Sequence, residues 1–216
     1  MSRTEAGAHR GRFITIEGSE GAGKSSCLQV VLETLAARGI TVHQTREPGG
    51  TPFAEELREC LLRPRTETVA PMAELLLVFA ARAQHVAATI EPQLAEGTWV
   101  VCDRFTDASY AYQGFGRGLP LDAIAALEAW THPGLQPDLT LLMDLDPDIG
   151  SARIRNRDLD RMEQEQRTFF NAVREGYRQR AAEFARFRVI DASAPIESVH
   201  GVVRGLVADY VDAAAP

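Results

Sequence analysis

The sequence predicts an α/β protein in which five parallel strands alternate with helices. Three observations support this class. Short apolar segments recur along the chain between helix-period patterns, as in parallel sheets covered by helices. A glycine-rich sequence ending in lysine and serine directly follows the first apolar segment. The chain has 216 residues, 45% of them hydrophobic, which suits one domain with its own core.

The glycine-rich sequence matches G-x-x-x-x-G-K-[ST], the phosphate-binding loop. Its glycines let successive backbone N–H groups turn inward around phosphate oxygens. The lysine reaches the β- and γ-phosphates, the serine hydroxyl can bind Mg²⁺, and the next helix adds the positive end of its dipole. The predicted fold is therefore a P-loop three-layer sandwich. The motif consists of Gly18, Ser19, Glu20, Gly21, Ala22, Gly23, Lys24 and Ser25.

The other elements follow from apolar patterns and their boundaries. Strands are expected at 13–16, 41–45, 98–102, 138–145 and 188–191. Helices are expected at 24–38, 51–62, 71–94, 121–130, 162–187 and 196–211, and another opens at Pro147 and runs into 161. Residues 1–12 are expected to form a flexible tail. Residues 13–212 are expected to form a single domain with a small lid at about 150–162.

Composition restricts the possible partners. The formal net charge is −7, so the whole protein is not expected to bind nucleic acid, and any anion site must be local. Cys27, Cys60 and Cys102 lack metal-binding spacing and indicate a reducing compartment. No uninterrupted apolar run approaches the ~20 residues that span a bilayer. A cytoplasmic protein without a membrane partner is expected.

Two predicted strands lead into charged residues. Segment 41–45 leads into Arg46 and Glu47 beside a Pro-Gly-Gly turn, and segment 98–102 leads into Asp103 and Arg104. Ligands of such sheets bind at the carboxyl ends of the strands. We expect Asp103 to hold Mg²⁺ together with Ser25, and Arg104 to face the phosphates. For Arg46 and Glu47, a surface ion pair is the alternative interpretation.

Two segments suit a pocket for a flat ligand. The stretch 109–118 combines aromatic, hydroxyl, amide and glycine residues, although a glycine-rich packing loop would have the same composition. Arg82 lies in the long apolar helix on the same side as Val78 and Phe79. From the residues alone, Arg82 can meet a ligand or cap the core.

A cluster of arginines marks the predicted lid. A basic segment that closes over a triphosphate would neutralise charge there. A solvated helix end is the alternative, because most runs of charge lie on solvated faces. The cluster consists of Arg153, Arg155, Arg157 and Arg161.

Together these segments resemble bacterial thymidylate kinase. The resemblance runs from Phe13 to about Val211. Thr-Arg-Glu-Pro-Gly-Gly at 45–50 is specific to this family, as is Asp-Arg at 103–104 followed by Ala-Tyr-Gln-Gly at 111–114. Phe-Ala-Ala-Arg at 79–82 and Leu-Asp-Arg at 159–161 also match. The phosphate loop alone would not distinguish this family from other kinases.

The resemblance implies transfer of the γ-phosphoryl group of ATP to dTMP, giving dTDP and ADP, with Mg²⁺. Lys24 and its loop would hold ATP, with Arg153 from the lid. Glu20 would lie near the dTMP sugar and the reacting phosphates. Arg46 and Arg104 would clamp the dTMP phosphate.

The resemblance also implies the residues that recognise the base. Arg82 would hydrogen-bond a thymine carbonyl. The family's stacking ring stands four residues before this arginine, where the chain has Val78, so Phe79 is the expected ring. Lid arginines would stabilise the transferring phosphoryl group. The remaining implied contacts are Glu47, Ser109, Tyr112 and Gln113 on the substrate, and Arg157 or Arg161 in the lid.

Two other functions remain open from the residues alone. A kinase of the same fold could act on a different small acceptor. A non-catalytic nucleotide-binding module could also use the loop, although the Asn-Lys-x-Asp sequence that reads guanine is absent. The resemblance implies a homodimer, whereas helix 71–94 could instead be internal to one domain.

Overall fold

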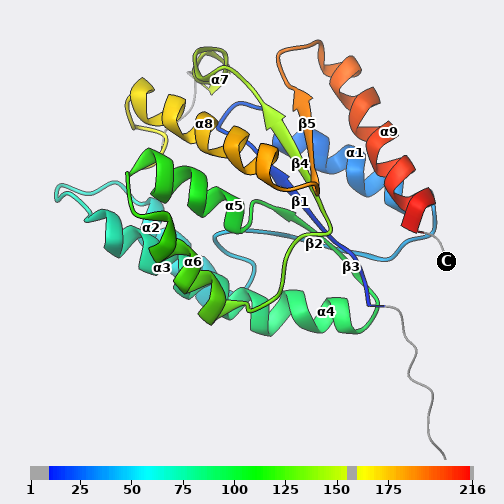
Figure 1. Ribbon diagram of the computed structural model, residues 1–216, viewed down its shortest axis with the longest axis horizontal. Coiled ribbons are helices and arrows are strands. Elements are labelled where there is room, and N and C mark those ends of the chain that lie inside the picture. Colours follow the sequence, from blue (N-terminus) through cyan, green and yellow to red (C-terminus); the bar gives the residue numbers. More distant parts are fainter. Residues whose placement is uncertain (1–9, 155–159, 215–216) are drawn as a thin grey trace, which may run out of the picture.

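A parallel five-stranded sheet forms the centre of the computed structural model, which describes residues 10–154 and 160–214 (Figure 1). The strand order is β2-β3-β1-β4-β5, and every neighbouring pair is parallel. The predicted α/β class is therefore confirmed. The strands are β1 (Phe13–Glu17), β2 (Val42–Arg46), β3 (Trp99–Asp103), β4 (Leu139–Asp144) and β5 (Phe187–Asp191).

Helices cover both faces of the sheet. On one face α1 and α9 pack together, and residues of α8, η2, η1 and α4 pack on the opposite face (Figure 1). The helices are α1 (Lys24–Ala36), α2 (Pro52–Leu62), α3 (Pro71–His85), α4 (Glu91–Ala95), α5 (Thr106–Ser109), α6 (Leu121–Thr131), α7 (Pro147–Ile154), α8 (Arg167–Glu183) and α9 (Ile196–Ala214). Two π-helical turns join them, η1 (Val86–Ile90) and η2 (Tyr110–Gly116).

Three local expectations differ from the structure. The stretch 109–118 is largely helical, because η2 continues α5 and buries Tyr110 and Tyr112. The helix expected from 162 begins only at Arg167, because residues 161–165 form turns. Gly11, expected to lie in a flexible tail, is held against α4, because its N–H donates to Leu94 O at 2.8 Å.

The long helical stretch Pro71–Ala95 is, within the described residues, the one that could cross a bilayer by length and composition. Half of the apolar part of this stretch is buried inside the protein (50%). Glu74, Arg82 and His85 interrupt the stretch and are themselves buried among protein groups. This pattern is that of a core helix.

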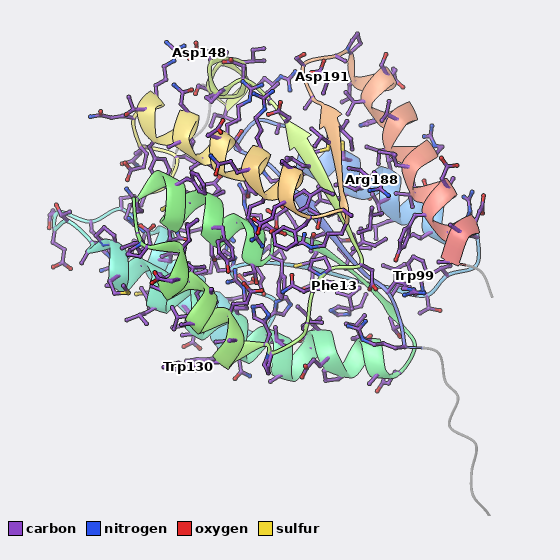
Figure 2. The ribbon with its side chains drawn as sticks, viewed as in Figure 1. Phe13, Trp99, Trp130, Asp148, Arg188 and Asp191 are labelled. Atoms are coloured by element: carbon purple, nitrogen blue, oxygen red, sulfur yellow. The ribbon has the colours of Figure 1, made fainter. Side chains whose placement is uncertain are left out.

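The sheet register brings the candidate site together. Ile16 of β1 and Arg46 of β2 both lie opposite Asp103 of β3. The carboxyl ends of these three strands therefore meet at one edge, next to the start of α1. Two aromatic residues away from this edge differ in exposure. Phe13 of β1 is fully buried, whereas Trp130 projects from α6 and is 82% exposed (Figure 2).

Candidate active site

A single large cavity of about 870 Å³ opens at the carboxyl edge of the sheet. The phosphate loop, the ends of β2 and β3, helix α3 and the α5–η2 segment all contribute to its wall. Most predicted site residues lie on this wall: Glu20, Gly21, Gly23, Lys24, Ser25, Arg46, Glu47, Arg82, Asp103, Arg104, Ser109, Tyr112, Gln113 and Arg153.

The phosphate loop has the backbone that its glycines allow. Gly18, Gly21 and Gly23 have φ of 136°, 72° and 84°, values that other residues rarely adopt. The Lys24 ammonium group folds back on the loop and donates to Ser19 O at 2.9 Å. Burial and the nearby Arg104 lower the pKa of Lys24 to about 8. The loop therefore places a cation with a lowered pKa beside backbone N–H groups at the start of α1, where an anion is favoured.

Helix α7 lies directly against this loop. The α-carbon of Gly150 approaches the loop so closely that a Cβ there would lie 2.5 Å from Glu20 O. A Cβ on Gly21 would in turn collide with Gly150 O. Arg153 of α7 donates to Gly21 O at 3.1 Å and to Ala192 O at 3.1 Å. The start of the predicted lid is thus braced against the phosphate loop.

Arg104 crosses the base of the cavity. It donates through Nη1 to Gly18 O and through Nη2 to Glu20 Oε1 at 2.7 Å. The Tyr112 hydroxyl donates to both Glu20 carboxylate oxygens at 2.8 Å, and the Tyr112 ring lies 5.2 Å from the guanidinium carbon of Arg104. Burial alone would raise the pKa of Glu20, but Arg104 and Lys24 lower it. Glu20 is therefore an ionised carboxylate at neutral pH.

Asp103 has one carboxylate oxygen available for a cation. Its Oδ1 is buried and makes no hydrogen bond to any described residue. Ser25 also lines the cavity at the start of α1. No cluster of three or more metal-ligating side chains occurs in the described ranges. This donor set fits Mg²⁺, which is usually held by one or two protein groups, substrate phosphates and water.

Three arginines of the cavity wall come from the ends of β2 and β3 and from α2. Arg46 is exposed and pairs with Glu55 at 2.9 Å, and Arg104 directly follows β3. The third, Arg58 of α2, donates to Pro48 O at 2.9 Å. Burial and the nearby Arg46 lower the pKa of Arg58. Arg58 was not predicted from the sequence, although its spacing in α2 places it on the same helical face as Ala54 and Leu61.

Arg82 is locked in place by buried partners. It is 2% exposed and donates to Glu47 Oε2 at 2.7 Å, to Ser109 Oγ at 3.0 Å and to Phe105 O at 3.2 Å. His85 approaches the other Glu47 oxygen at 3.1 Å. Burial would raise the pKa of Glu47, but Arg82 lowers it. The guanidinium group has five N–H donors, and these three bonds leave others for a ligand. A fixed polar wall of this kind suits recognition of a flat, polar ring.

Arg161 lies in a separate group of charges that we call the Glu74 cluster. Glu74 is fully buried on α3 and accepts from Arg161 Nη2 at 2.7 Å. It also accepts from Gln113 Nε2 at 3.0 Å and from Arg117 Nε at 3.1 Å. Arg161 Nε donates in addition to Leu61 O at 2.8 Å. This cluster ties η2 and the C-terminal end of the predicted lid to α2 and α3.

Comparison of the sequence with known proteins shows which family the chain belongs to. Residues 16–203 match the family model described as thymidylate kinase. The chain belongs to the thymidylate kinase family. Proteins named thymidylate kinase are 57% identical over 197 residues in Chromohalobacter salexigens, 58% over 191 in Alcanivorax borkumensis and 51% over 203 in Methylobacillus flagellatus. These matches cover 88–93% of this chain and 92–98% of the relatives.

The family resemblance placed one ring in the wrong environment. Phe79, expected to stack on a base, is 2% exposed and lies in a core cluster with Leu75, Tyr110 and Ile124. Val78 lines the cavity instead. One helical residue corresponds to a rotation of about 100°, so neighbouring residues face different surroundings. The thymidylate kinase ring position is thus filled by an aliphatic side chain here.

The predicted lid arginines separate into three groups. Arg153 lines the cavity, as expected for a residue near ATP. Arg161 lies in the Glu74 cluster and not among the residues of the cavity wall, so its predicted contact with the transferring phosphoryl group has no support in this arrangement. Arg155 and Arg157 lie outside the described residues.

Proposed function

We propose that the protein transfers the γ-phosphoryl group of ATP to dTMP, as the names of its relatives indicate. One observation carries the proposal: a single cavity joins the phosphate loop to a cluster of arginines and to the polar wall around Arg82. A triphosphate, an acceptor phosphate and a base edge therefore each find groups of the required chemistry within one space.

The donor triphosphate would lie on the phosphate loop. Lys24 and the loop N–H groups would bind its oxygens, and Arg153 would lie beside them. Phosphate binding would also favour the charged form of Lys24, whose pKa burial lowers. Ser25 and Asp103 would hold Mg²⁺, which would neutralise charge on the bound phosphates.

The acceptor would lie on the opposite side of the cavity. Arg46, Arg58 and Arg104 would bind the dTMP phosphate. Arg82 and Ser109 would recognise the thymine edge, with Gln113 and Tyr112 nearby. Because Gln113 Nε2 already donates to Glu74, its carbonyl oxygen is the group left to accept from a ligand.

The chemical step needs positioning more than a protein nucleophile. An anionic oxygen of dTMP attacks the γ-phosphorus while the bond from that phosphorus to the bridging oxygen of ADP breaks. Arg104 and Lys24 would stabilise charge on both sides of the transferring group. Glu20, fixed by Arg104 and Tyr112, would hold the Arg104 guanidinium group in place between substrates. Arg157 in the lid remains a proposed contact.

We further propose a homodimer that works in the cytoplasm without nucleic-acid or membrane partners. Phe53 of α2 and Met72 and Leu76 of α3 are 53%, 42% and 50% exposed. Large apolar side chains grouped on packed helices are typical of interfaces. Sedimentation of the wild type and of a Leu76→Glu variant tests the dimer, since a charge at an apolar interface should favour the monomer.

The decisive experiment measures ADP formation with Mg-ATP and one acceptor at a time: dTMP, dUMP, dCMP, AMP or shikimate. We expect strong preference for dTMP. Preference for another acceptor would keep the phosphate-loop kinase but overturn the roles of Arg82 and Ser109. Folded protein without any acceptor-dependent turnover would indicate a nucleotide-binding module.

A further inference from the structure

Glu17 is a buried carboxylate that the function described above does not use. It is the last residue of β1, directly before the phosphate loop, and is fully buried. Two donors hold its oxygens: the Phe105 N–H bonds Oε1 at 2.7 Å, and the Tyr177 hydroxyl bonds Oε2 at 2.8 Å. Burying a carboxylate costs folding free energy unless hydrogen bonds compensate, and these two donors supply such bonds.

The first partner belongs to an unusual turn. Arg104 has φ of 69°, and it is the one non-glycine residue with positive φ in the described part of the chain. This conformation costs an L-residue roughly 1–2 kcal/mol and needs support from its surroundings. The Arg104 N–H donates to Ile16 O at 3.0 Å, and the Cys102 thiol donates to Arg104 O at 2.9 Å. The Phe105 N–H, bound by Glu17, completes the set.

These bonds control where the Arg104 side chain points. Two of these hydrogen bonds involve the peptide group between Arg104 and Phe105. The Cys102 thiol donates to its oxygen, and its N–H donates to Glu17. If the bond to Glu17 is lost, that peptide group can rotate, and the residue can relax toward ordinary backbone angles. Its guanidinium group would then leave Gly18 and Glu20, the groups that hold it over the cavity.

We propose that Glu17 is a positioning residue that holds the Arg104–Phe105 turn and thereby aims the Arg104 guanidinium group at the acceptor phosphate. The inference rests on the proposed function, because it assigns Arg104 to that phosphate. Glu17 itself lines no part of the cavity, so it acts through Arg104 and touches no substrate.

Tyr177 fixes the second carboxylate oxygen and links the turn to α8. Its ring also packs against Tyr112 at 6.3 Å between centroids, and Tyr112 underlies Arg104. Held at both oxygens, the carboxylate cannot rotate away from the Phe105 N–H. Helix α8 therefore supports the same arginine from two directions.

The positioning role does not need a charge on Glu17. Burial and the nearby Asp107 raise the pKa of Glu17 to about 8, against the opposing effects of Arg104, Tyr177 and the Phe105 amide. A protonated carboxyl group still has an oxygen that accepts from the Phe105 N–H. A glutamine at this position offers the same acceptor, and its amide group can donate to Tyr177 Oη.

The test compares Glu17→Gln with Glu17→Ala in the full-length protein. Affinities for dTMP and thymidine are measured by calorimetry, and kcat and KM by ADP formation. We expect Glu17→Gln to stay within about threefold of the wild type. Glu17→Ala should lose on the order of tenfold or more in dTMP affinity and in kcat/KM, because a displaced guanidinium group cannot meet the phosphate. Thymidine has no phosphate, so its affinity should change less than about threefold.

Two controls separate positioning from general damage. Thr15→Val removes a buried side-chain hydrogen bond, 2.9 Å to Thr140, from the same strand without touching the turn. It should leave the ratio of dTMP to thymidine affinity unchanged. In an Arg104→Ala background, Glu17→Ala should cause no further loss of dTMP affinity. If Glu17→Ala fails to fold, Glu17→Met fills the space without an oxygen acceptor and should show the same selective loss.

Different failures have different meanings. Equal losses for dTMP and thymidine, an undiminished loss in the Arg104→Ala background, or wild-type behaviour of both Glu17→Ala and Glu17→Met would each overturn the positioning role. A wild-type protein that shows no turnover with dTMP would instead refute the proposed function, whatever the Glu17 variants do.

Discussion

At the residue scale, Lys24 is the only lysine in a chain whose other strongly basic residues are all arginine. A compact ammonium group on a flexible stem and a planar guanidinium group make different phosphate contacts. We expect Lys24→Ala to lower kcat by roughly 10²–10³-fold. Lys24→Arg should recover only part of the lost kcat, because the planar guanidinium group of arginine is too large for the loop. Kinetics with Mg-ATP and dTMP check this.

The fold of these variants is the control. Among the described residues, the Lys24 ammonium group donates to Ser19 O alone, so its loss should leave the melting temperature and dTMP binding close to wild type. A near-normal kcat for folded Lys24→Ala would remove the loop lysine from the mechanism.

Phe79 and Val78 give a second prediction at this scale. Because Phe79 lies in the core, Phe79→Leu should cost about 1–2 kcal/mol of unfolding free energy. Its KM for dTMP should change less than about twofold. Val78→Thr, which alters the cavity wall but keeps the side-chain volume, should shift KM for dTMP more than kcat. Urea unfolding measures the stability effect, and steady-state kinetics measure KM and kcat for both variants. A large increase of KM for dTMP in Phe79→Leu would indicate that the Phe79 ring contacts the substrate.

At the scale of elements, the contact between α7 and the phosphate loop depends on Gly150. A Cβ there would lie 2.5 Å from Glu20 O, a backbone atom, so the helix or the loop must shift. We expect Gly150→Ala to raise KM for ATP about tenfold or more, although alanine favours a helix by ~1 kcal/mol.

Gly201→Ala on α9 is the matched control, because a Cβ at that position meets nothing within 4 Å. It should keep normal kinetics and gain stability from its helix propensity. If the two alanine variants had the same KM for ATP, α7 would not be braced against the loop in solution.

The Glu74 cluster offers a prediction about how separate elements are held together. Removing Glu74 leaves Arg117, Arg161 and Gln113 without their shared acceptor. Since both arginines reach solvent in part, we expect Glu74→Ala to cost about 2–4 kcal/mol. Glu74→Gln keeps an acceptor oxygen and should cost less. Chemical unfolding measures both, and similar stability of the alanine variant and wild type would show that the cluster contributes little.

Elements with strong local signals could be predicted from the sequence. The phosphate loop and the apolar strands are specified by nearby residues, so their positions were confirmed to within a few residues. The π-helical turn η2 was expected as a possible loop, because Gly114 and Gly116 weaken a helix pattern locally. In the fold, Leu121 and Phe169 pack where their Cβ atoms would be. Tertiary packing therefore decides this segment.

The candidate site was predictable to the extent that strand ends share an edge. Asp103 and Arg46 follow from that rule, and the register places them opposite each other. The depth of a helical residue depends on which neighbours cover it, which the chain order does not state. Arg58 and Glu74 were missed for this reason, and Arg161 was assigned to phosphate although it lies beside Glu74.

At the scale of the whole molecule, the net charge of −7 coexists with a cavity lined by five arginines and a lysine. The wall of the cavity is therefore locally basic in a chain whose net charge is negative. A locally basic cavity can bind nucleotide phosphates even though the protein as a whole carries a negative charge. Several buried carboxylates support the cavity, and their protonation links the site to global stability.

Glu17 gives the clearest link between pH and stability. Its pKa is about 8 in the folded protein, raised by burial and Asp107 from 4.5. Between these values the folded state keeps a proton that the unfolded state has lost, so the free energy of unfolding falls as pH rises. The slope approaches ~1.4 kcal/mol per pH unit at most. Glutamine does not titrate, so Glu17→Gln should lack this fall.

Urea unfolding of both proteins between pH 5.5 and 7.5 measures the difference, and titrating histidines contribute equally to each and cancel. The wild type should lose ~1 kcal/mol or more relative to Glu17→Gln over this range. Parallel curves would show that the Glu17 carboxyl group is ionised throughout, held by Arg104 and its two hydrogen-bond donors more strongly than burial opposes it. The Arg104–Phe105 turn would then rest on a carboxylate, with the same donors and the same geometry.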